Sequence, residues 1–282
     1  MTGSPTVRQR ELGKRLRDLR NQHDLTVEDV AEKLHCSATK ISRLETGARR
    51  ATLRDVRDLC GLYDVGESTS AELVDLARGA REQVWWTQYE DLKLDPYLGL
   101  EQSATAITSY TTYYVPALLQ TEEYTRAVIK AIAPKMDPEI FEQRVEVRMQ
   151  RQHVLEEDNR PRYRVLLDQA VLYRRVGDPA IMTAQLDRVL DAERLRKVDI
   201  QVIPFSIGVH AAQDSNFVLL EFEQDPGRRP MIFIEGLTGN QYLERETDIA
   251  RYREAIQYLS DSALSPGDSI SYINDIRRTY DS

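Results

Sequence analysis

The stretch that decides the fold runs from Thr26 to Glu45 and reads TVEDVAEKLHCSATKISRLE. Its apolar residues recur at helical spacing in two groups, Val27, Val30, Ala31 and Leu34 in the first half and Ile41 and Leu44 in the second. Thr26 precedes the first group and Ser37 precedes the second, and both are residue types that begin helices by capping backbone amides. The pattern therefore predicts two short helices joined by a tight turn at residues 34–36.

Helical patterns also flank this pair. Residues 7–21 carry Leu12, Leu16 and Leu19 at the i, i+4 and i+7 positions of one helix face. Gly47 is suited to end the second short helix, because glycine adopts the left-handed conformation that helix C-termini often require. A further helix is expected from Thr52, with these residues facing inward: Leu53, Val56, Leu59, Cys60 and Tyr63. The first 65 residues are therefore predicted to form a small helical domain.

The second short helix presents small polar and cationic side chains on the face left exposed when Ile41 and Leu44 are buried. A helix-turn-helix places such a helix in the DNA major groove, where its N-terminal end and middle reach base edges. We expect three residues to contact bases, through thymine methyl groups or through the two acceptors of guanine: Ala38, Thr39 and Arg43. Six neighbours are better placed for phosphates: Ser37, Lys40, Ser42, Arg49, Arg50 and Thr52. Periodicity alone leaves an ordinary solvated helix surface equally open.

The run of residues around this helix resembles the phage-repressor-like helix-turn-helix family of the Xre and Cro type. The matching residues are Leu25, Thr26, Val30, Ala31, Leu34, Ser37, Gly47 and the run ISRLE at 41–45. The resemblance implies a five-helix domain and an ion pair between Arg20 and Glu45 that braces the recognition helix. Two positions depart from the family. Val27 stands where glutamine commonly helps to grip DNA, and His35 stands where the turn usually has glycine.

The charge distribution separates the first 65 residues from the rest. The whole chain carries a formal net charge of −8, which by itself argues against binding to polyanionic DNA. Residues 1–65, however, hold 13 Lys and Arg against 10 Asp and Glu, whereas residues 66–282 hold 25 against 36. A basic N-terminal part suits phosphate contact, and an acidic remainder is repelled by phosphates.

The rest of the chain mixes helix and strand patterns. Strands are predicted at residues 163–167, 200–204, 217–222 and 231–234, the last two as a hairpin. Helices are predicted at 101–114, from Thr121, and at 138–157, 168–174, 179–196, 246–259 and 268–280. The expected fold is a mostly α N-terminal helix-turn-helix domain plus a larger α+β C-terminal domain with a small sheet. We place the helix-turn-helix domain at 1–66, a helical connector at 67–95 and a regulatory and dimerisation domain at 96–282.

Short motifs are spread over the C-terminal part: YLGLE at 97–101, VPALLQT at 115–121, Arg151-Gln152, Val176-Gly177, QVIP at 201–204 and GVH at 208–210. They resemble the C-terminal domain of uncharacterised function in WhiJ-like regulators of actinobacteria. One position departs, since Ala117 stands where that group usually has glycine. The resemblance implies a transcription regulator, often antitoxin-like, that works with a small protein encoded beside it. It supplies no catalytic site.

The sequence offers no pattern for catalysis or for metal or cofactor binding. Nucleophile-elbow, Walker and dinucleotide-binding glycine patterns are absent, and the four histidines are scattered. Two cysteines in apolar helical patterns are typical of reduced, packed thiols, and no apolar run approaches the roughly 20 residues of a membrane span. We therefore expect a cytoplasmic protein that is not an enzyme. Convergence of four carboxylates in a pocket would instead indicate one: Glu101, Asp168, Glu221 and Glu235.

Together these features predict a sequence-specific DNA-binding regulator, most simply a homodimeric repressor on double-stranded DNA with an inverted-repeat operator. The C-terminal part is expected to dimerise and to receive a signal from a small partner protein, at a groove or sheet edge near the hairpin of residues 217–234. The alternative is a one-component sensor whose C-terminal domain binds a small-molecule ligand. An apolar pocket with few polar groups would favour the sensor, and an exposed groove or apolar patch would favour the partner.

Overall fold

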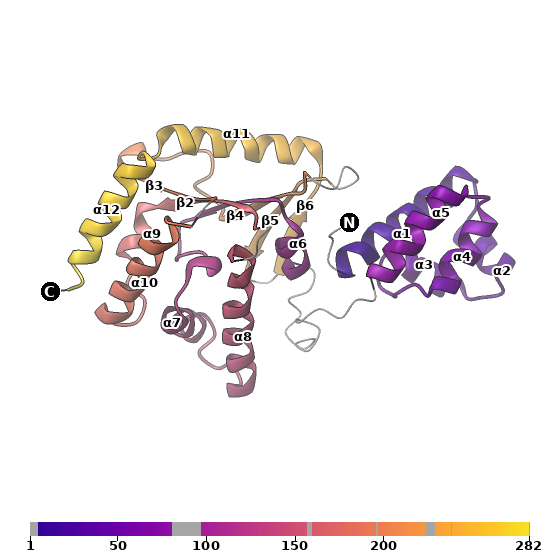
Figure 1. Cartoon of the computed structure of the whole chain (residues 1–282), viewed down its shortest axis with the longest axis horizontal. Coiled ribbons are helices and arrows are strands. Elements are labelled where there is room, and N and C mark those ends of the chain that lie inside the picture. Colours follow the sequence, from indigo (N-terminus) through magenta and orange to yellow (C-terminus); the bar gives the residue numbers. More distant parts are fainter. Residues whose placement is uncertain are drawn as a thin grey trace. The chain divides into compact units, whose positions relative to one another are not determined.

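The protein divides into two compact units, Met1–Ser103 and Ala104–Ser282. The computed structural model describes residues 5–80, 97–156, 160–195, 197–223, 229–237 and 239–281. Within them the first unit is helical, and the second combines helices with a six-stranded sheet (Figure 1). The predicted fold class is therefore confirmed.

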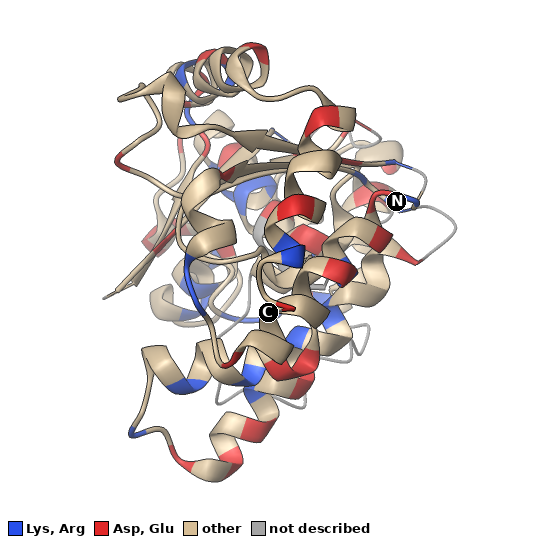
Figure 2. Ribbon diagram, turned by 90° about the vertical axis from the view of Figure 1, so that its left-hand side faces the viewer, with Lys and Arg blue, Asp and Glu red and all other residues tan. Residues whose placement is uncertain are grey.

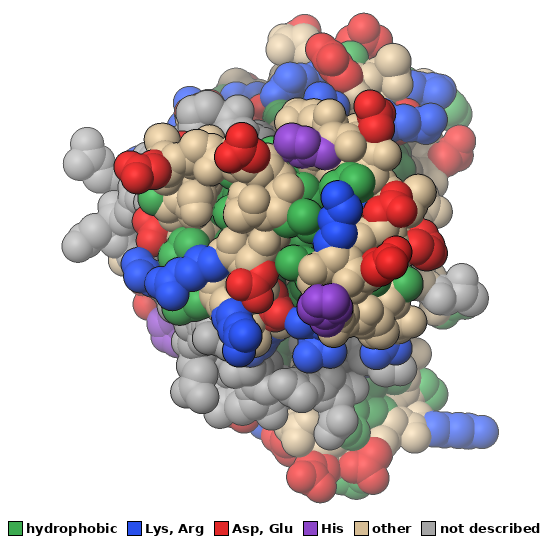
Figure 3. All heavy atoms as spheres, turned by 90° about the vertical axis from the view of Figure 1, so that its right-hand side faces the viewer, with side chains coloured by type: hydrophobic (Ala, Val, Ile, Leu, Met, Phe, Trp, Pro, Cys, Tyr) green, Lys and Arg blue, Asp and Glu red, His purple; other side chains and the backbone are tan. Residues whose placement is uncertain are grey.

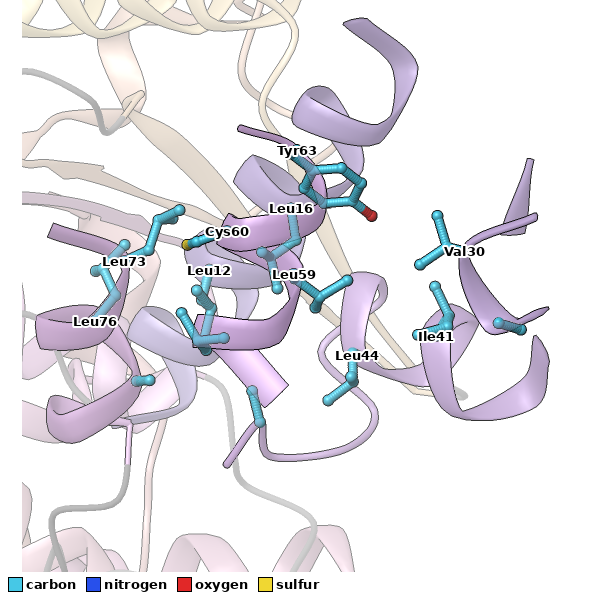
Figure 4. Packing of buried hydrophobic residues seen from close by; sticks show 14 residues of the cluster. Leu12, Leu16, Val30, Ile41, Leu44, Leu59, Cys60, Tyr63, Leu73 and Leu76 are labelled. Carbon is cyan, nitrogen blue, oxygen red and sulfur yellow. The ribbon is translucent and has the colours of Figure 1, made fainter. Parts of the chain in front are cut away.

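Five helices share one hydrophobic core in the first unit: α1 (Pro5–Gln22), α2 (Val27–Lys33), α3 (Ala38–Glu45), α4 (Leu53–Leu62) and α5 (Glu67–Gly79). Figure 4 shows Leu12 and Leu16 of α1 beside Leu59 of α4 in this core. Val30 of α2 and Ile41 of α3 are buried in the same cluster. Helices α2, α3 and α4 have 7, 8 and 10 residues and would be marginal in isolation, so the shared core supplies most of their stability.

Helix α5 belongs to this core and not to a connector. Its residues Leu73, Leu76 and Ala77 are buried in the same cluster as the apolar residues of α1 and α4. The prediction of a connector at 67–95 is therefore wrong for residues 67–79, because their apolar stripe completes the helical core. Residues 81–95 of that prediction lie outside the described part. The last element of the first unit is α6 (Tyr97–Ser103).

Three helices of the first unit, α1, α2 and α4, are followed two residues beyond their ends by a residue other than glycine with a positive φ. These residues are Asp24 (51°), His35 (48°) and Asp64 (46°). After α2, the amide of Cys36 donates to the carbonyl of Ala31, and the amide of His35 donates to that of Glu32. These are the paired hydrogen bonds of a Schellman motif. His35 thus adopts the conformation that the usual glycine of this turn would provide.

The second unit is built on a sheet with the strand order β3-β2-β1-β4-β5-β6. The strands are β1 (Ala106–Thr111), β2 (Arg162–Asp168), β3 (Val198–Ile203), β4 (Phe217–Glu221), β5 (Met231–Gly236) and β6 (Gly239–Leu243). Strands β1, β2 and β3 are parallel, and β4, β5 and β6 continue the sheet with antiparallel pairing. The carboxyl ends of the three parallel strands therefore lie at the same end of the sheet.

Helices cover both faces of this sheet (Figure 1). Helix α11 (Glu246–Ser262) lies on one face, and its residues Ile249, Ile256 and Leu259 join the apolar core between this helix and the sheet. The opposite face carries α7 (Glu122–Ile132), α8 (Pro138–Arg151) and α10 (Pro179–Ala192). The short α9 (Gln169–Tyr173) follows β2, and α12 (Pro266–Arg278) packs against α10 and β3. Single 3-10 turns occur at Ala117–Leu119, Gln152–Leu155 and Phe205–Ile207.

One helix prediction for this part of the chain is wrong. Residues 101–114, predicted to be helical, contain the end of α6 and then strand β1. The hairpin of residues 217–234 does not lie at a sheet edge, because β6 pairs with β5 and β1 pairs with β4. The outer strands of the described sheet are β3 and β6. Because the edge strand β6 lies beside this hairpin, docking of a partner protein at a groove or sheet edge near the hairpin stays a prediction.

Charged residues of both signs are scattered over the second unit. Figure 2 shows Asp and Glu interspersed with Lys and Arg along its helices. Among the described residues, no helix is both long enough and apolar enough to cross a membrane.

Candidate nucleic-acid interface

Helix α3 presents one continuous polar stripe. The helix begins at Ser37, whose Oγ accepts a hydrogen bond from the Lys40 amide at 3.2 Å. Ile41 and Leu44 are buried, and the opposite face exposes four residues: Thr39, Ser42, Arg43 and Thr46. Their i, i+3, i+4 and i+7 spacing places them in a row along the helix. The stripe carries one cation among three hydroxyl groups, a composition suited to contact with base edges.

The buried face of α3 is held by the ion pair between Arg20 and Glu45. The Arg20 guanidinium donates two hydrogen bonds to the Glu45 carboxylate, from Nε at 2.7 Å and from Nη2 at 2.9 Å. Arg20 also donates to the carbonyl oxygen of Leu25 at 2.8 Å. The Glu45 side chain is only 3% exposed, so these bonds satisfy a carboxylate that water does not reach. This is the ion pair that the family resemblance implied, and it fixes α3 to α1.

Helix α1 approaches the C-terminal end of α3 closely at Gly13. A Cβ atom at that position would lie 2.6 Å from the carbonyl oxygen of Leu44 and 2.7 Å from that of Glu45. Only glycine fits between the two backbones without displacing one of them. The loop after α3 is held to α1 as well, because Gln9 Nε2 donates to the carbonyl oxygen of Gly47 at 2.5 Å.

A second polar cluster joins α3 to the start of α4. The Lys40 ammonium lies 2.5 Å from Asp55 Oδ1, and Asp55 Oδ2 accepts a hydrogen bond from the Thr52 amide at 2.9 Å. The Thr52 hydroxyl in turn accepts one from the Asp55 amide at 3.0 Å, which completes a capping box. Burial opposes ionisation of Asp55, but the bonds from Lys40 and Thr52 outweigh it and hold the pKa of Asp55 below its ordinary value.

The structure brings most of the predicted DNA-contacting residues to the surface of the first unit. Six are exposed: Ser37, Thr39, Ser42, Arg43, Arg49 and Arg50. Ala38 is half-buried and packs against the core. Lys40 is engaged by Asp55, and the Thr52 amide already has a partner. Contact of all these residues with DNA remains a prediction, and it is weakest for Ala38 and Thr52.

Thr46 is a residue that the sequence reasoning missed. It continues the exposed stripe one turn beyond Ser42, and the i+3 spacing from Arg43 could have revealed it. Figure 3 shows one face of the first unit, where basic, acidic and small apolar groups are intermixed and no single charge dominates.

Two of the four carboxylates considered for a catalytic pocket, Asp168 and Glu221, lie apart. Asp168 Oδ1 accepts a hydrogen bond from the Ala170 amide at 2.8 Å and caps α9. Glu221 pairs with Arg253 at 2.6 Å, at the opposite end of the sheet from Asp168. In the part of the chain that the structure describes, no three His, Cys, Asp or Glu side chains are grouped to hold a metal ion.

Two capped helices, a Schellman turn between them and an exposed polar stripe on the second define a helix-turn-helix, the class of domain that binds DNA. Residues 11–73 match a family described as a helix-turn-helix domain. Residues 94–275 match a family described as a domain of unknown function, DUF5753, and the protein belongs to this family. No curated protein matches the sequence.

Proposed function

We propose that the protein is a sequence-specific transcription regulator that represses from an inverted-repeat operator. The observation that carries this proposal is the exposed stripe of α3, in which Arg43 is the one charged residue. Arg43 can donate two hydrogen bonds to O6 and N7 of a guanine, and Thr39 can contact a neighbouring base. Arg49 and Arg50 follow α3 and are exposed for phosphate contact.

The interactions behind the stripe support this role. Glu45 is satisfied by Arg20, and Asp55 is satisfied by Lys40 and Thr52. A helix that is fixed before DNA arrives loses little conformational freedom on binding, so more of the contact energy appears as affinity. The Lys40 ammonium has three donors, so it can approach a phosphate while it keeps its bond to Asp55.

Substitution of Arg43 tests the base reading. Genome-wide footprinting first identifies the operator, and fluorescence anisotropy then measures the affinity of the full-length protein for it. Arg43→Ala should weaken operator binding by about 1–3 kcal/mol and relax one base position. Arg50→Ala should weaken all duplexes alike and reduce the salt slope by about 1. Arg78→Ala removes an exposed arginine of α5 and serves as the control. Unchanged operator affinity of Arg43→Ala would show that α3 does not read bases.

We further propose that the protein acts as a homodimer. One recognition helix covers only a few base pairs, which gives too little discrimination against genomic competitors. A two-fold dimer would instead read inverted half-sites separated by about 10 bp or a multiple of it. Sedimentation of the full-length protein with and without operator tests this. A stable monomer that binds a single half-site with full affinity would contradict it.

A small partner protein is the proposed source of regulation, in an antitoxin-like arrangement. The support is the size and acidity of the second unit and its resemblance to WhiJ-like regulators, which work with a small neighbouring protein. Such a partner shifts DNA binding only if it binds the free and DNA-bound forms with different affinities. Calorimetric titration of the neighbour-encoded protein, with and without operator, measures that difference. Binding of a small metabolite without any binding of that protein would favour the one-component sensor.

A further inference from the structure

The segment of residues 115–121 after β1 is held rigidly by three glutamines. Gln120 Nε2 donates to the carbonyl oxygen of Val115 at 2.6 Å. Gln152 Nε2 donates to the carbonyl oxygens of Ala117 and Gln120 at 3.0 and 2.7 Å. Gln185 donates to the Leu119 carbonyl at 2.7 Å and accepts from the Thr121 amide at 2.8 Å. Gln120 and Gln185 are fully buried, so the polar backbone of this segment is satisfied without water.

Arg148 of α8 reaches this segment but finds only a neutral partner there. Its Nη1 lies 3.3 Å from Gln120 Oε1, an oxygen that also accepts a hydrogen bond from the Thr125 hydroxyl at 2.9 Å. Arg148 is half-buried. Across the described residues no carboxylate forms an ion pair with Arg148. A guanidinium has five N–H donors, so most of the hydrogen-bonding capacity of Arg148 is left for another group.

The charges around Arg148 do not neutralise it. Burial lowers the pKa of Arg148, and the nearby positive charge of Arg151 lowers it further, whereas Tyr114 and Glu235 act in the opposite direction. Tyr114 supplies no negative charge near neutral pH, because burial raises the pKa of its phenol above the ordinary value. Glu235 is exposed at the end of β5. A partly buried guanidinium without a full counter-charge is unfavourable, and an anion from solution would relieve that cost.

We propose that Arg148 binds the oxyanion of a small ligand, a carboxylate or a phosphate group. Arg144 lies one turn earlier on α8, is exposed, and has no ion pair within the described part of the chain. The i, i+4 spacing puts Arg144 and Arg148 on the same face of the helix. The protonated phenol of Tyr114 is a neighbouring neutral donor. The glutamine-held segment fixes one side of the site, so the ligand meets donors that are already in place. The site does not depend on the DNA-binding role proposed above.

Isothermal titration calorimetry of the full-length protein tests the site, with sodium phosphate and sodium succinate as probes at matched ionic strength against sodium chloride. The parent should bind at least one probe saturably. Arg148→Gln should bind that probe at least tenfold more weakly, and Arg148→Lys should fall between them, because lysine keeps the charge but loses the planar fork of donors. Arg251→Gln removes an exposed arginine of α11 and should bind as the parent does. Binding of phosphate alone would indicate a phosphorylated ligand, and binding of succinate alone a carboxylate.

Thermal unfolding without added anion separates a binding role from a structural one. If Arg148 serves a ligand, Arg148→Gln should unfold at the same temperature as the parent or higher, because a desolvated charge has been removed. Absence of binding of both probes to the parent, or equal binding by parent and Arg148→Gln, would overturn the proposal. Should Arg148→Gln fail to fold, Arg144→Gln and Arg148→Lys decide the matter. If Arg144→Gln and Arg148→Lys both bind the probe as the parent does, the proposal is overturned.

Discussion

The two units differ in the hydrogen-bond partner that each provides for a partly buried arginine. In the first unit, Arg20 donates two hydrogen bonds to the Glu45 carboxylate, and these bonds raise the pKa of Arg20. In the second unit, Arg148 meets the amide oxygen of Gln120, and burial lowers the pKa of Arg148. An arginine that is paired with a carboxylate of the same chain holds two helices together. An arginine whose partner is neutral can still bind an anionic ligand. The first arrangement fixes the helix that we propose to read DNA, and the second leaves a site that we expect an anion to complete.

Removal of Glu45 should have the largest effect. Glu45→Ala leaves the Arg20 guanidinium without its carboxylate in the core, at a cost of about 3–5 kcal/mol. Hydrogen exchange of peptides from residues 26–63 in the full-length protein measures the loss. Adding Arg20→Met should recover much of it, because an apolar replacement of both partners leaves no unpaired charge. If Glu45→Ala is no more harmful than Arg148→Gln, the contrast between the two arginines fails.

Removal of one of the glutamines that hold residues 115–121 should have the next largest effect on stability. It tests whether this segment of the second unit is held as firmly as α3 is in the first. Gln185→Leu leaves the Leu119 carbonyl and the Thr121 amide without their partners, at a total cost of about 3 kcal/mol. Thermal unfolding of the full-length protein measures this. Gln257→Leu, at an exposed position of α11, is the control and should stay within about 0.5 kcal/mol of the parent. Equal stability of the two variants would mean that the segment is not held as described.

Addition of one methyl group at Gly13 should lower the stability of the first unit, because the atoms that block it belong to the backbone of α3 and cannot move as a side chain can. Gly13→Ala should destabilise the first unit by about 1–3 kcal/mol and weaken operator binding, since α3 must move. Gly61→Ala is the matched control, because a Cβ there meets nothing within 4 Å. That variant should be stabilised by roughly 0.5–1 kcal/mol through helix propensity. Hydrogen exchange measures the change in stability, and fluorescence anisotropy measures the change in operator affinity. Normal DNA affinity in Gly13→Ala would show that the close approach does not position α3.

The pH dependence of the first unit should give the smallest effect. The pKa of Asp55 is lowered on folding, so its carboxylate stabilises the folded state above the unfolded pKa of about 3.9, and this contribution disappears as pH falls through the folded value. Asp55→Asn should therefore cost about 1 kcal/mol at pH 7, through the weakened capping box, and much less near pH 2. Hydrogen exchange at several pH values measures the difference. A difference from the parent that stays constant with pH would contradict the assignment, and Asp58→Asn is the exposed control.

The helical unit was predictable from sequence because its signals are local. The caps at Thr26 and Ser37, the apolar spacing around Ile41 and the turn at His35 each act within a few residues. The pairing of Lys40 with Asp55 was not predictable, because it depends on how α4 packs beside α3. The fifth helix was recognised as a helix, but only the assembled core shows that it belongs to the first unit.

Two strands escaped prediction for opposite reasons. Strand β1 lies in the middle of the sheet and is buried almost throughout, so its sequence AITSYT lacks the polar–apolar alternation of a half-exposed strand. Strand β6 lies at the edge and has the polar sequence GNQYL, which carries no apolar signal. The candidate anion site was equally hidden, because it depends on Arg148 and Gln120 meeting across 28 residues of sequence.

The position of β1 at the centre of the sheet has a consequence for synthesis on the ribosome. The described helices of the first unit all precede β1 in the chain, so this unit can fold before the partners of β1 emerge. Strand β1 must wait for β2, which begins at Arg162, and for β4, which ends at Glu221. At about 5–20 residues per second, the second of these partners emerges roughly 6–22 s after β1. We therefore expect the first unit of the nascent chain to be folded for several seconds while the apolar strand β1, which follows it in the sequence, is still unpaired.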